Sequence, residues 1–145
     1  MTRSGLIQNA DHLKQASPLV HWPPGLEPRN VDVFIHNEGW IDASPDIVWA
    51  NLIDASQWPS WYSNSADLRI EGGQPQLGMG VSFNWKTFGF PIRSTVDAFD
   101  PGREIGWSVD NPVFMVHHGW VLVRSSSTSS SRTRCMMVIS LGCPR

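Results

Sequence analysis

The chain has 145 residues, enough for one domain with a sizeable core but too few for two. Hydrophobic residues make up 41% of it and charged residues 17%, which fits a globular protein with slightly fewer charges than usual. The net charge of -2 gives no basis for binding nucleic acid or an anionic membrane, and no stretch approaches the roughly 20 apolar residues of a membrane span. The N-terminus lacks the apolar run of a signal peptide, so we expect a cytoplasmic protein.

Tryptophan is unusually frequent, with eight Trp against one Tyr. Large rings fill cores, and they also line pockets for apolar ligands. The two cysteines, Cys135 and Cys143, lie outside any zinc or redox motif and are expected to be free thiols. The glycine-rich stretch 72–80 lacks the G-K-[ST] of a phosphate-binding loop, so its glycines are expected in turns. We therefore expect neither a metal nor a cofactor.

Residues 1–29 are expected to form an extended N-terminal arm. Their stretch "SPLVHWPPGLEP" contains four prolines, which remove amide donors and fix φ. Val20, Trp22 and Leu26 are the side chains expected to hold this arm against the rest of the chain. Residues 30–145 are expected to form a single domain.

The first strand and the first helix follow the arm. Apolar residues recur at every second position from residue 31 to 35, which is the period of a strand. Ser44 and Pro45 favour a helix start, because serine can cap free amides and proline is tolerated in the first turn. Pro59 disfavours helix at Trp58, so a break or a second short helix is expected. Between these signals runs an apolar stripe at helical spacing, formed by Val48, Trp49, Leu52 and Ile53.

From about residue 67 the pattern changes to short strands joined by short links, which favours an antiparallel meander. The expected strands are "DLRI", "VSFNWKTF", "FPIRSTVDAF", "EIGWSV" and "VFMVHHGWVLV". The Ser-rich stretch at 124–132 is expected to be a loop, and "CMMVISL" after it a last strand. The predicted fold is therefore α+β, with an antiparallel sheet of about six to seven strands and two short helices after the first strand.

Three motifs follow one another along the chain. They are the P-x-x-V-W of Pro45 to Trp49, the W-P-x-W of Trp58 to Trp61 and the F-x-P-G-R-x-I-x-W of Phe99 to Trp107. In this order they resemble the SRPBCC, or START-like, superfamily, and within it the polyketide cyclase/dehydratase branch. The resemblance covers residues 31–123. It implies a helix-grip fold, in which a curved antiparallel sheet wraps around a long C-terminal helix, two short helices close one end, and a deep apolar cavity lies between sheet and helix.

The sequence departs from this family at its C-terminal end. Family members continue past the last strand into a long helix, whereas here four residues follow "CMMVISL". The long helix is therefore expected to be absent, through a frameshift, mis-splicing or truncation, or in a natural short variant. An uncovered sheet would favour self-association or docking of the arm. The side chains then expected to face water are Phe83, Trp85, Ile92, Val96 and Trp107.

The candidate ligand-binding residues are those that strand alternation places on the inward face, where the cavity wall is also the core. They are Phe83, Trp85, Phe90, Ile92, Ser94, Val96, Trp107, His118 and Trp120. On the outward face, Arg93, Asp97 and Glu104 are expected at a solvated surface. No carboxylate pair and no Ser-His-Asp arrangement is evident in the sequence.

Two polar residues of the inward face could carry chemistry. His117 and His118 are adjacent on a strand, so their side chains point to opposite faces and cannot share one metal. His118 could orient a ligand or act as a general acid or base, although a hydrogen-bonded structural histidine is the alternative. Ser94 is either a pocket hydroxyl or a small residue tolerated in the core.

Two classes of function remain. The first is binding of a hydrophobic small molecule such as a lipid, a polyketide or a steroid-like compound, with a second copy of the chain as a further partner. The second is a cyclase/dehydratase-like enzyme, in which His118 moves a proton and Ser94 anchors the substrate. A truncated remnant without function is the third outcome.

Overall fold

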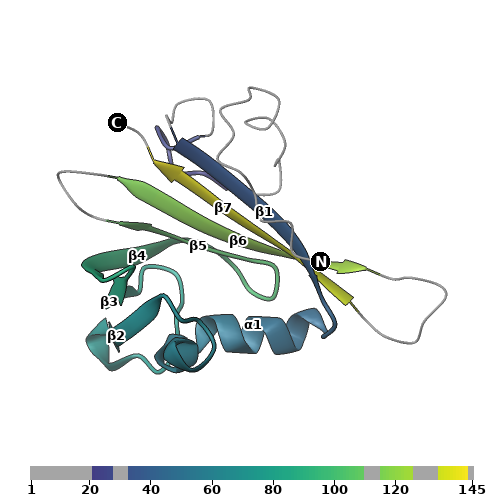
Figure 1. Ribbon diagram of the computed structural model, residues 1–145, viewed down its shortest axis with the longest axis horizontal. Coiled ribbons are helices and arrows are strands. Elements are labelled where there is room, and N and C mark those ends of the chain that lie inside the picture. Colours follow the sequence, from purple (N-terminus) through teal and green to yellow (C-terminus); the bar gives the residue numbers. More distant parts are fainter. Residues whose placement is uncertain (1–20, 28–32, 110–114, 126–133, 144–145) are drawn as a thin grey trace.

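The computed structural model describes residues 21–27, 33–109, 115–125 and 134–143. Its centre is a seven-stranded antiparallel sheet with the strand order β1-β7-β6-β5-β4-β3-β2 (Figure 1). The strands are β1 (Val33–Ile41), β2 (Ser65–Ile70), β3 (Ser82–Thr87), β4 (Phe90–Asp100), β5 (Glu104–Val109), β6 (Val116–Ser125) and β7 (Arg134–Cys143). The predicted α+β class and the predicted number of strands are confirmed.

Three short helical segments lie between β1 and β3. They are α1 (Pro45–Ile53) and the 3-10 segments η3 (Ala55–Ser60) and η4 (Glu71–Gly73). The first two confirm the predicted pair of short helices, and η4 is a single turn that the sequence did not predict. Across the described ranges no helix exceeds the nine residues of α1, and none there is long and apolar enough to cross a membrane.

Parts of four predicted segments fall outside the described residues: the arm, the first strand at 31–32, the strand "VFMVHHGWVLV" at 113–114, and the Ser-rich loop. Val20 belongs to the undescribed part of the predicted arm. Most of the predicted Ser-rich loop is also outside, whereas its first two residues, Arg124 and Ser125, belong to β6.

Both ends of α1 are closed by hydrogen bonds that its sequence provides. At the start, the Ser44 side chain accepts a hydrogen bond from the Ile47 amide at 3.4 Å, and Pro45 occupies the first turn as predicted. At the other end, the Trp58 indole N–H donates to the Leu52 carbonyl at 3.0 Å. The Leu77 amide donates to the Ile53 carbonyl at 2.9 Å. Carbonyls of the last turn, which have no partner within a helix, are satisfied in this way.

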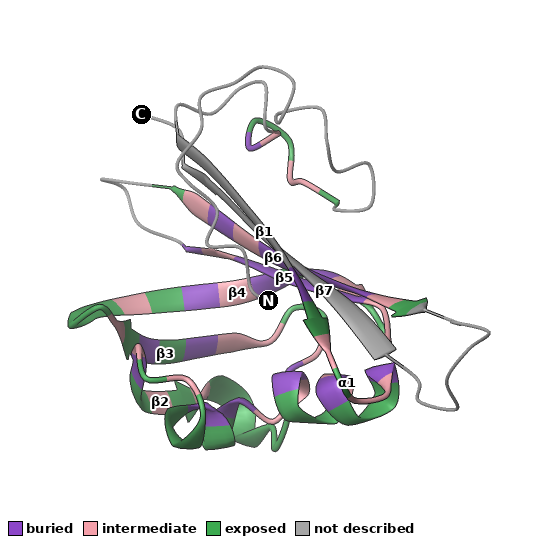
Figure 2. Cartoon of the chain, turned by 45° about the vertical axis from the view of Figure 1, so that its right-hand side comes forward, coloured by how far each residue is buried: buried purple, intermediate pink, exposed green. Residues whose placement is uncertain are grey.

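The α1 and η3 segments pack under one face of the sheet, which we call the concave face (Figure 2). Trp58 of η3 is 2% exposed and is the centre of this packing. Its ring centroid lies 5.1 Å from that of Trp107, 5.5 Å from that of Trp85 and 5.6 Å from that of Phe83. The η3 segment, which begins after the end of α1 and contains Pro59, therefore turns its largest side chain into the core.

This packing corrects the prediction that the concave face is open to water. Phe83, Trp85, Val96 and Trp107 are all buried, and Ile92 is half-buried. The prediction was wrong because it assigned the covering of these rings to a long helix alone, whereas α1 and η3 cover them. The reason for expecting self-association through these side chains is removed as well.

Trp58→Ala should destabilise the protein by about 3–5 kcal/mol, because it leaves a large cavity among three rings and removes a cap of α1. Urea unfolding followed by circular dichroism measures this change. Trp61→Ala is the matched control, since Trp61 is 46% exposed. It should change the free energy of unfolding by no more than about 0.5 kcal/mol. Equal effects of the two substitutions would contradict this account of the core.

Candidate functional site

The structure brings eight of the nine predicted ligand-binding residues to the concave face. Five of them belong to one buried cluster, and Ile92 packs against it. Ser94 and His118 contact members of that cluster. The five are Phe83, Trp85, Val96, Trp107 and Trp120. Phe90 does not join them, because it lies at the turn between β3 and β4 and is 71% exposed.

Ser94 forms a hydrogen bond with the buried indole ring of Trp85. Its side chain is fully buried, and its hydroxyl oxygen accepts a hydrogen bond from the Trp85 indole N–H at 3.1 Å. The two residues lie on the neighbouring strands β4 and β3. The hydroxyl therefore satisfies a buried donor, which a small apolar residue at this position could not do.

Trp107, His118 and Trp120 form a continuous row of rings across β5 and β6, which we call the aromatic row. Trp107 and His118 are paired across the two strands, and their ring centroids are 5.0 Å apart. His118 and Trp120 lie two residues apart on β6 and share a face, with ring centroids 5.5 Å apart. The Trp58 ring packs on the Trp107 end of this row. His118 is only half-buried.

The aromatic row contains an unsatisfied hydrogen-bond donor. The indole N–H of Trp120 is buried, and no polar atom of the described residues accepts a hydrogen bond from it. A buried donor without a partner costs about 1–3 kcal/mol, so most proteins avoid it. The site can therefore gain free energy from any acceptor that reaches this nitrogen.

The imidazole of His118 is held in its neutral form. Burial lowers the pKa of His118 to about 3, and the nearby His117 lowers it further by charge repulsion. At neutral pH only about one molecule in ten thousand carries the imidazolium. A neutral imidazole offers one N–H donor and one acceptor nitrogen.

The opposite, convex face carries a polar network that the sequence did not predict. The Ser108 hydroxyl donates to Asp97. The His117 Nδ1 atom lies 3.0 Å from the Ser108 hydroxyl and 3.3 Å from an Asp97 carboxylate oxygen. A β-bulge between Val96 and Ala98 leaves Asp97 unpaired in the ladder, and its side chain contacts Ser108 and His117. The sequence reasoning missed this cluster because strand alternation alone does not reveal a bulge.

These three residues do not form a nucleophilic triad. In such a triad the histidine lies between serine and carboxylate and takes the serine proton. Here the Ser108 proton points to Asp97, so the network assigns the Nδ1 proton to His117. His117 is also fully buried. The network therefore joins β4, β5 and β6 rather than presenting a nucleophile.

A short piece of the predicted arm, residues 21–27, covers this network. The His21 amide donates to Glu104 at 2.7 Å, and the His21 ring contacts the other oxygen of the same carboxylate. Trp22 lies edge-on to the His117 ring, with centroids 5.3 Å apart, and packs against Val121. The prediction of a solvated Glu104 was therefore wrong: its side chain is 2% exposed because the arm lies over it.

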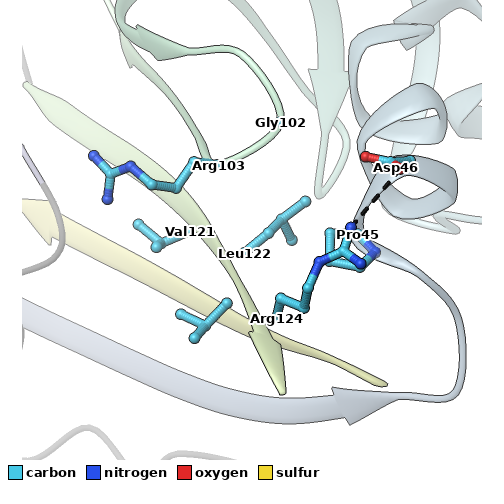
Figure 3. A pocket seen from close by; sticks show the side chains of 8 residues that line it. Pro45, Asp46, Gly102, Arg103, Val121, Leu122 and Arg124 are labelled. Atoms are coloured by element: carbon cyan, nitrogen blue, oxygen red, sulfur yellow. Dashed lines mark ion pairs between the residues drawn. The ribbon is translucent and has the colours of Figure 1, made fainter. Parts of the chain in front are cut away.

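Two hollows lie on the molecule; none of the predicted ligand-binding residues lines the first, whereas Trp85 and Ile92 line the second. One, of about 390 Å³, lies where α1 begins beside β6 (Figure 3). There Asp46 and Arg124 form a long ion pair of 3.9 Å. The other, of about 310 Å³, lies near the turn between β3 and β4. It is lined by Asp67, Asn84, Trp85, Lys86, Pro91, Ile92, Arg93 and Val109.

Known proteins share this sequence pattern and fold. Residues 37–141 match the model of a family described as "Polyketide cyclase / dehydrase and lipid transport". No curated protein matches the sequence. The crystal structure of the hypothetical protein jhp0584 from Helicobacter pylori is 22% identical with a TM-score of 0.74, over 86% of this chain and 77% of that one.

Two further solved structures are more distant. The ginseng major latex-like protein 151 from Panax ginseng is 10% identical with a TM-score of 0.56, over 77% of this chain and 80% of that one. CalU16 from Micromonospora echinospora is 16% identical with a TM-score of 0.50, over 74% of this chain. The match spans 60% of CalU16, less than two thirds of its length. At these identities the likeness shows the fold alone.

Gly106→Ala should destabilise the protein by about 1–3 kcal/mol, because the added methyl would lie 2.9 Å from His117 Nε2 and 3.3 Å from the Ala98 Cβ atom. Urea unfolding measures the cost. The same substitution in a His117→Ala background should cost at least about 1 kcal/mol less. An equal cost in both backgrounds would show that the close approach to His117 is not its cause.

His118 should make the protein less stable in acid. The pKa of His118 in the folded protein lies below the unfolded value of 6.5. Its contribution to the free energy of unfolding is therefore complete above pH 6.5 and is lost as the pH falls toward 3. Between pH 7 and pH 5 the wild type should lose about 1–2 kcal/mol more than His118→Gln. Urea unfolding at several pH values measures this difference. Parallel pH profiles for the two proteins would contradict it.

Proposed function

Because the chain belongs to the polyketide cyclase / dehydrase and lipid transport family, and thereby to the START-like superfamily that its motifs resemble, we propose that it binds an uncharged hydrophobic small molecule. The ligand lies against the aromatic row of Trp107, His118 and Trp120. The observation that carries this proposal is the buried indole N–H of Trp120, which has no acceptor in the described part of the chain.

The walls of the proposed site are apolar. Trp58 occupies the space over β3 and part of β5, so the ligand contacts β6, where His118 is half-buried. The remaining predicted residues form the wall behind the aromatic row and position it. They are Phe83, Trp85, Ile92, Ser94 and Val96. This combination of a large apolar surface with few polar groups is typical of small-molecule sites.

The polar groups of the site define the ligand class. Trp120 offers a donor, and neutral His118 offers a donor and an acceptor. Neither group carries a charge that would offset the desolvation of a charged ligand. A hydrophobic compound with a carbonyl or hydroxyl oxygen therefore suits the site, as in a neutral lipid, a polyketide or a steroid-like molecule.

A cyclase/dehydratase-like reaction is the second candidate, because the family description includes such enzymes. It needs a group in the site that moves a proton. His118 is the group in position, but a pKa of about 3 leaves it without a proton to donate at neutral pH and makes it a weak base. Binding is therefore the better supported function.

The test uses two uncharged fluorescent probes, a naphthyl ketone dye and the hydrocarbon pyrene. Trp120→Phe keeps an aromatic ring but removes the indole N–H. It should weaken binding of the ketone about 3- to 10-fold, the value of one hydrogen bond, and leave pyrene binding unchanged. Fluorescence titration measures both dissociation constants.

Trp40→Phe is the matched control, since Trp40 is 53% exposed on β1 and should affect neither probe. Equal loss of both probes in Trp120→Phe would show that the ring and not its N–H matters. Absence of binding by the wild type would overturn the proposal.

A further inference from the structure

Aromatic side chains gather at the turn that joins β3 and β4. Phe88 and Phe90 are each 71% exposed, and Trp61 is 46% exposed. The backbone places the segments that carry them at the same end of the sheet, because Thr87 pairs with Phe90 on one side and with Ser65 of β2 on the other. Figure 2 shows this turn as an exposed projection at the left of the sheet.

Tyr62 connects the two parts of this cluster. Its ring centroid lies 6.2 Å from that of Trp61, and its hydroxyl is hydrogen-bonded to the Thr87 side chain. We call Trp61, Tyr62, Phe88 and Phe90 the aromatic tip. Single exposed hydrophobic residues are normal on a protein surface, but several large ones near one turn favour an interaction site.

Phe88 also has an unfavourable backbone conformation. Its φ is +50° and that of Gly89 is +80°, as in the type I′ turns of tight hairpins. Such turns favour Asn-Gly, because a bulky residue is rarely found at positive φ. The exposed ring of Phe88 gains little packing in return. Fold stability therefore does not explain a phenylalanine at this position, whereas binding to a partner does.

The size of the aromatic tip argues against a protein partner or a second copy. From typical aromatic side-chain areas, its exposed surface is about 400 Å². A stable protein interface needs about 800 Å² from each partner.

Four charged residues beside the tip form two ion pairs, and the exposed Arg69 of β2 lies opposite Asn84 of β3. Lys86 pairs with Asp67 at 3.0 Å, and Arg93 pairs with Glu71 at 3.0 Å. These charges leave an excess of one positive charge near the tip, which gives only a weak attraction for an anionic partner. A bilayer interface needs neither shape complementarity nor charge, and it is the environment in which Trp and Tyr rings are enriched.

We propose that the aromatic tip docks on the surface of a zwitterionic lipid bilayer, with Phe88 and Phe90 entering the interface and Trp61 and Tyr62 at the level of the headgroups. The hollow of about 310 Å³ near this turn includes Trp85 and Ile92 of the concave face. A bilayer would then be the source of the hydrophobic ligand, a step that rests on the proposed function; the docking itself does not.

The test is co-flotation of the protein with phosphatidylcholine vesicles, without added ligand. The wild type should bind, and raising the salt concentration should leave its binding unchanged. Phe88→Asn should weaken vesicle binding roughly tenfold, the value of burying one large apolar side chain. The same substitution should raise Tm, because Asn-Gly suits the turn. A decrease in binding together with an increase in stability separates the docking role from a role in folding.

Ile47→Gln is the matched control. Ile47 is 58% exposed, and it lies on α1, away from the turn between β3 and β4 (Figure 2). Its substitution should leave vesicle binding unchanged. The proposal is overturned if the wild type does not bind vesicles, or if Phe88→Asn binds as well as the wild type. It is also overturned if the tip mediates a concentration-dependent dimer that Phe88→Asn abolishes. None of these results affects ketone binding at Trp120, so failure of docking is distinguishable from failure of the proposed function.

Discussion

The Trp58 side chain, inserted between the helices and the sheet, is the interaction on which the rest of the structure depends. It contacts rings of β3 and β5 at centroid distances of 5.1–5.6 Å and hydrogen-bonds the end of α1. A single residue thus closes the helix, covers the concave face and contacts one end of the aromatic row. The burial of Phe83, Trp85 and Trp107 follows from it. Because Trp58 occupies the space next to Trp107, the region over β6 is the part of the concave face proposed for a ligand.

The two adjacent histidines of β6 lie in different environments, on opposite faces of the sheet. His117 lies on the convex face, where Ser108 and Asp97 satisfy its Nδ1 atom. His118 lies one residue further, between two tryptophan rings, with a depressed pKa. Adjacent side chains of a strand point to opposite faces, so the two imidazoles never share a site. Their charges still interact, which is why His117 contributes to the low pKa of His118.

Two features that cost free energy lie at the two sites proposed above. One is the unsatisfied indole N–H of Trp120, and the other is the positive φ of the exposed Phe88. Such costs persist when they serve something outside the fold. The first is at the proposed ligand site and the second at the proposed membrane contact. Their separation along the sheet allows each to be changed without disturbing the other.

The sequence by itself determined the local structure. Alternation placed the strands, Ser44 and Pro45 began α1, Trp58 and Pro59 marked a second short helix, and the motifs from Pro45 to Trp107 identified the family. Eight of the nine candidate site residues also share a face, because side-chain direction in a strand has a period of two. Only the tertiary structure decided what covers each face: that Trp58 turns inward, that Glu104 lies under the arm, and that Phe90 stays exposed. The physical reason is that periodicity is a local property, whereas burial depends on which distant segment packs on top. A bulge such as the one that places Asp97 beside Ser108 and His117 likewise arises from pairing between strands, which no single strand encodes.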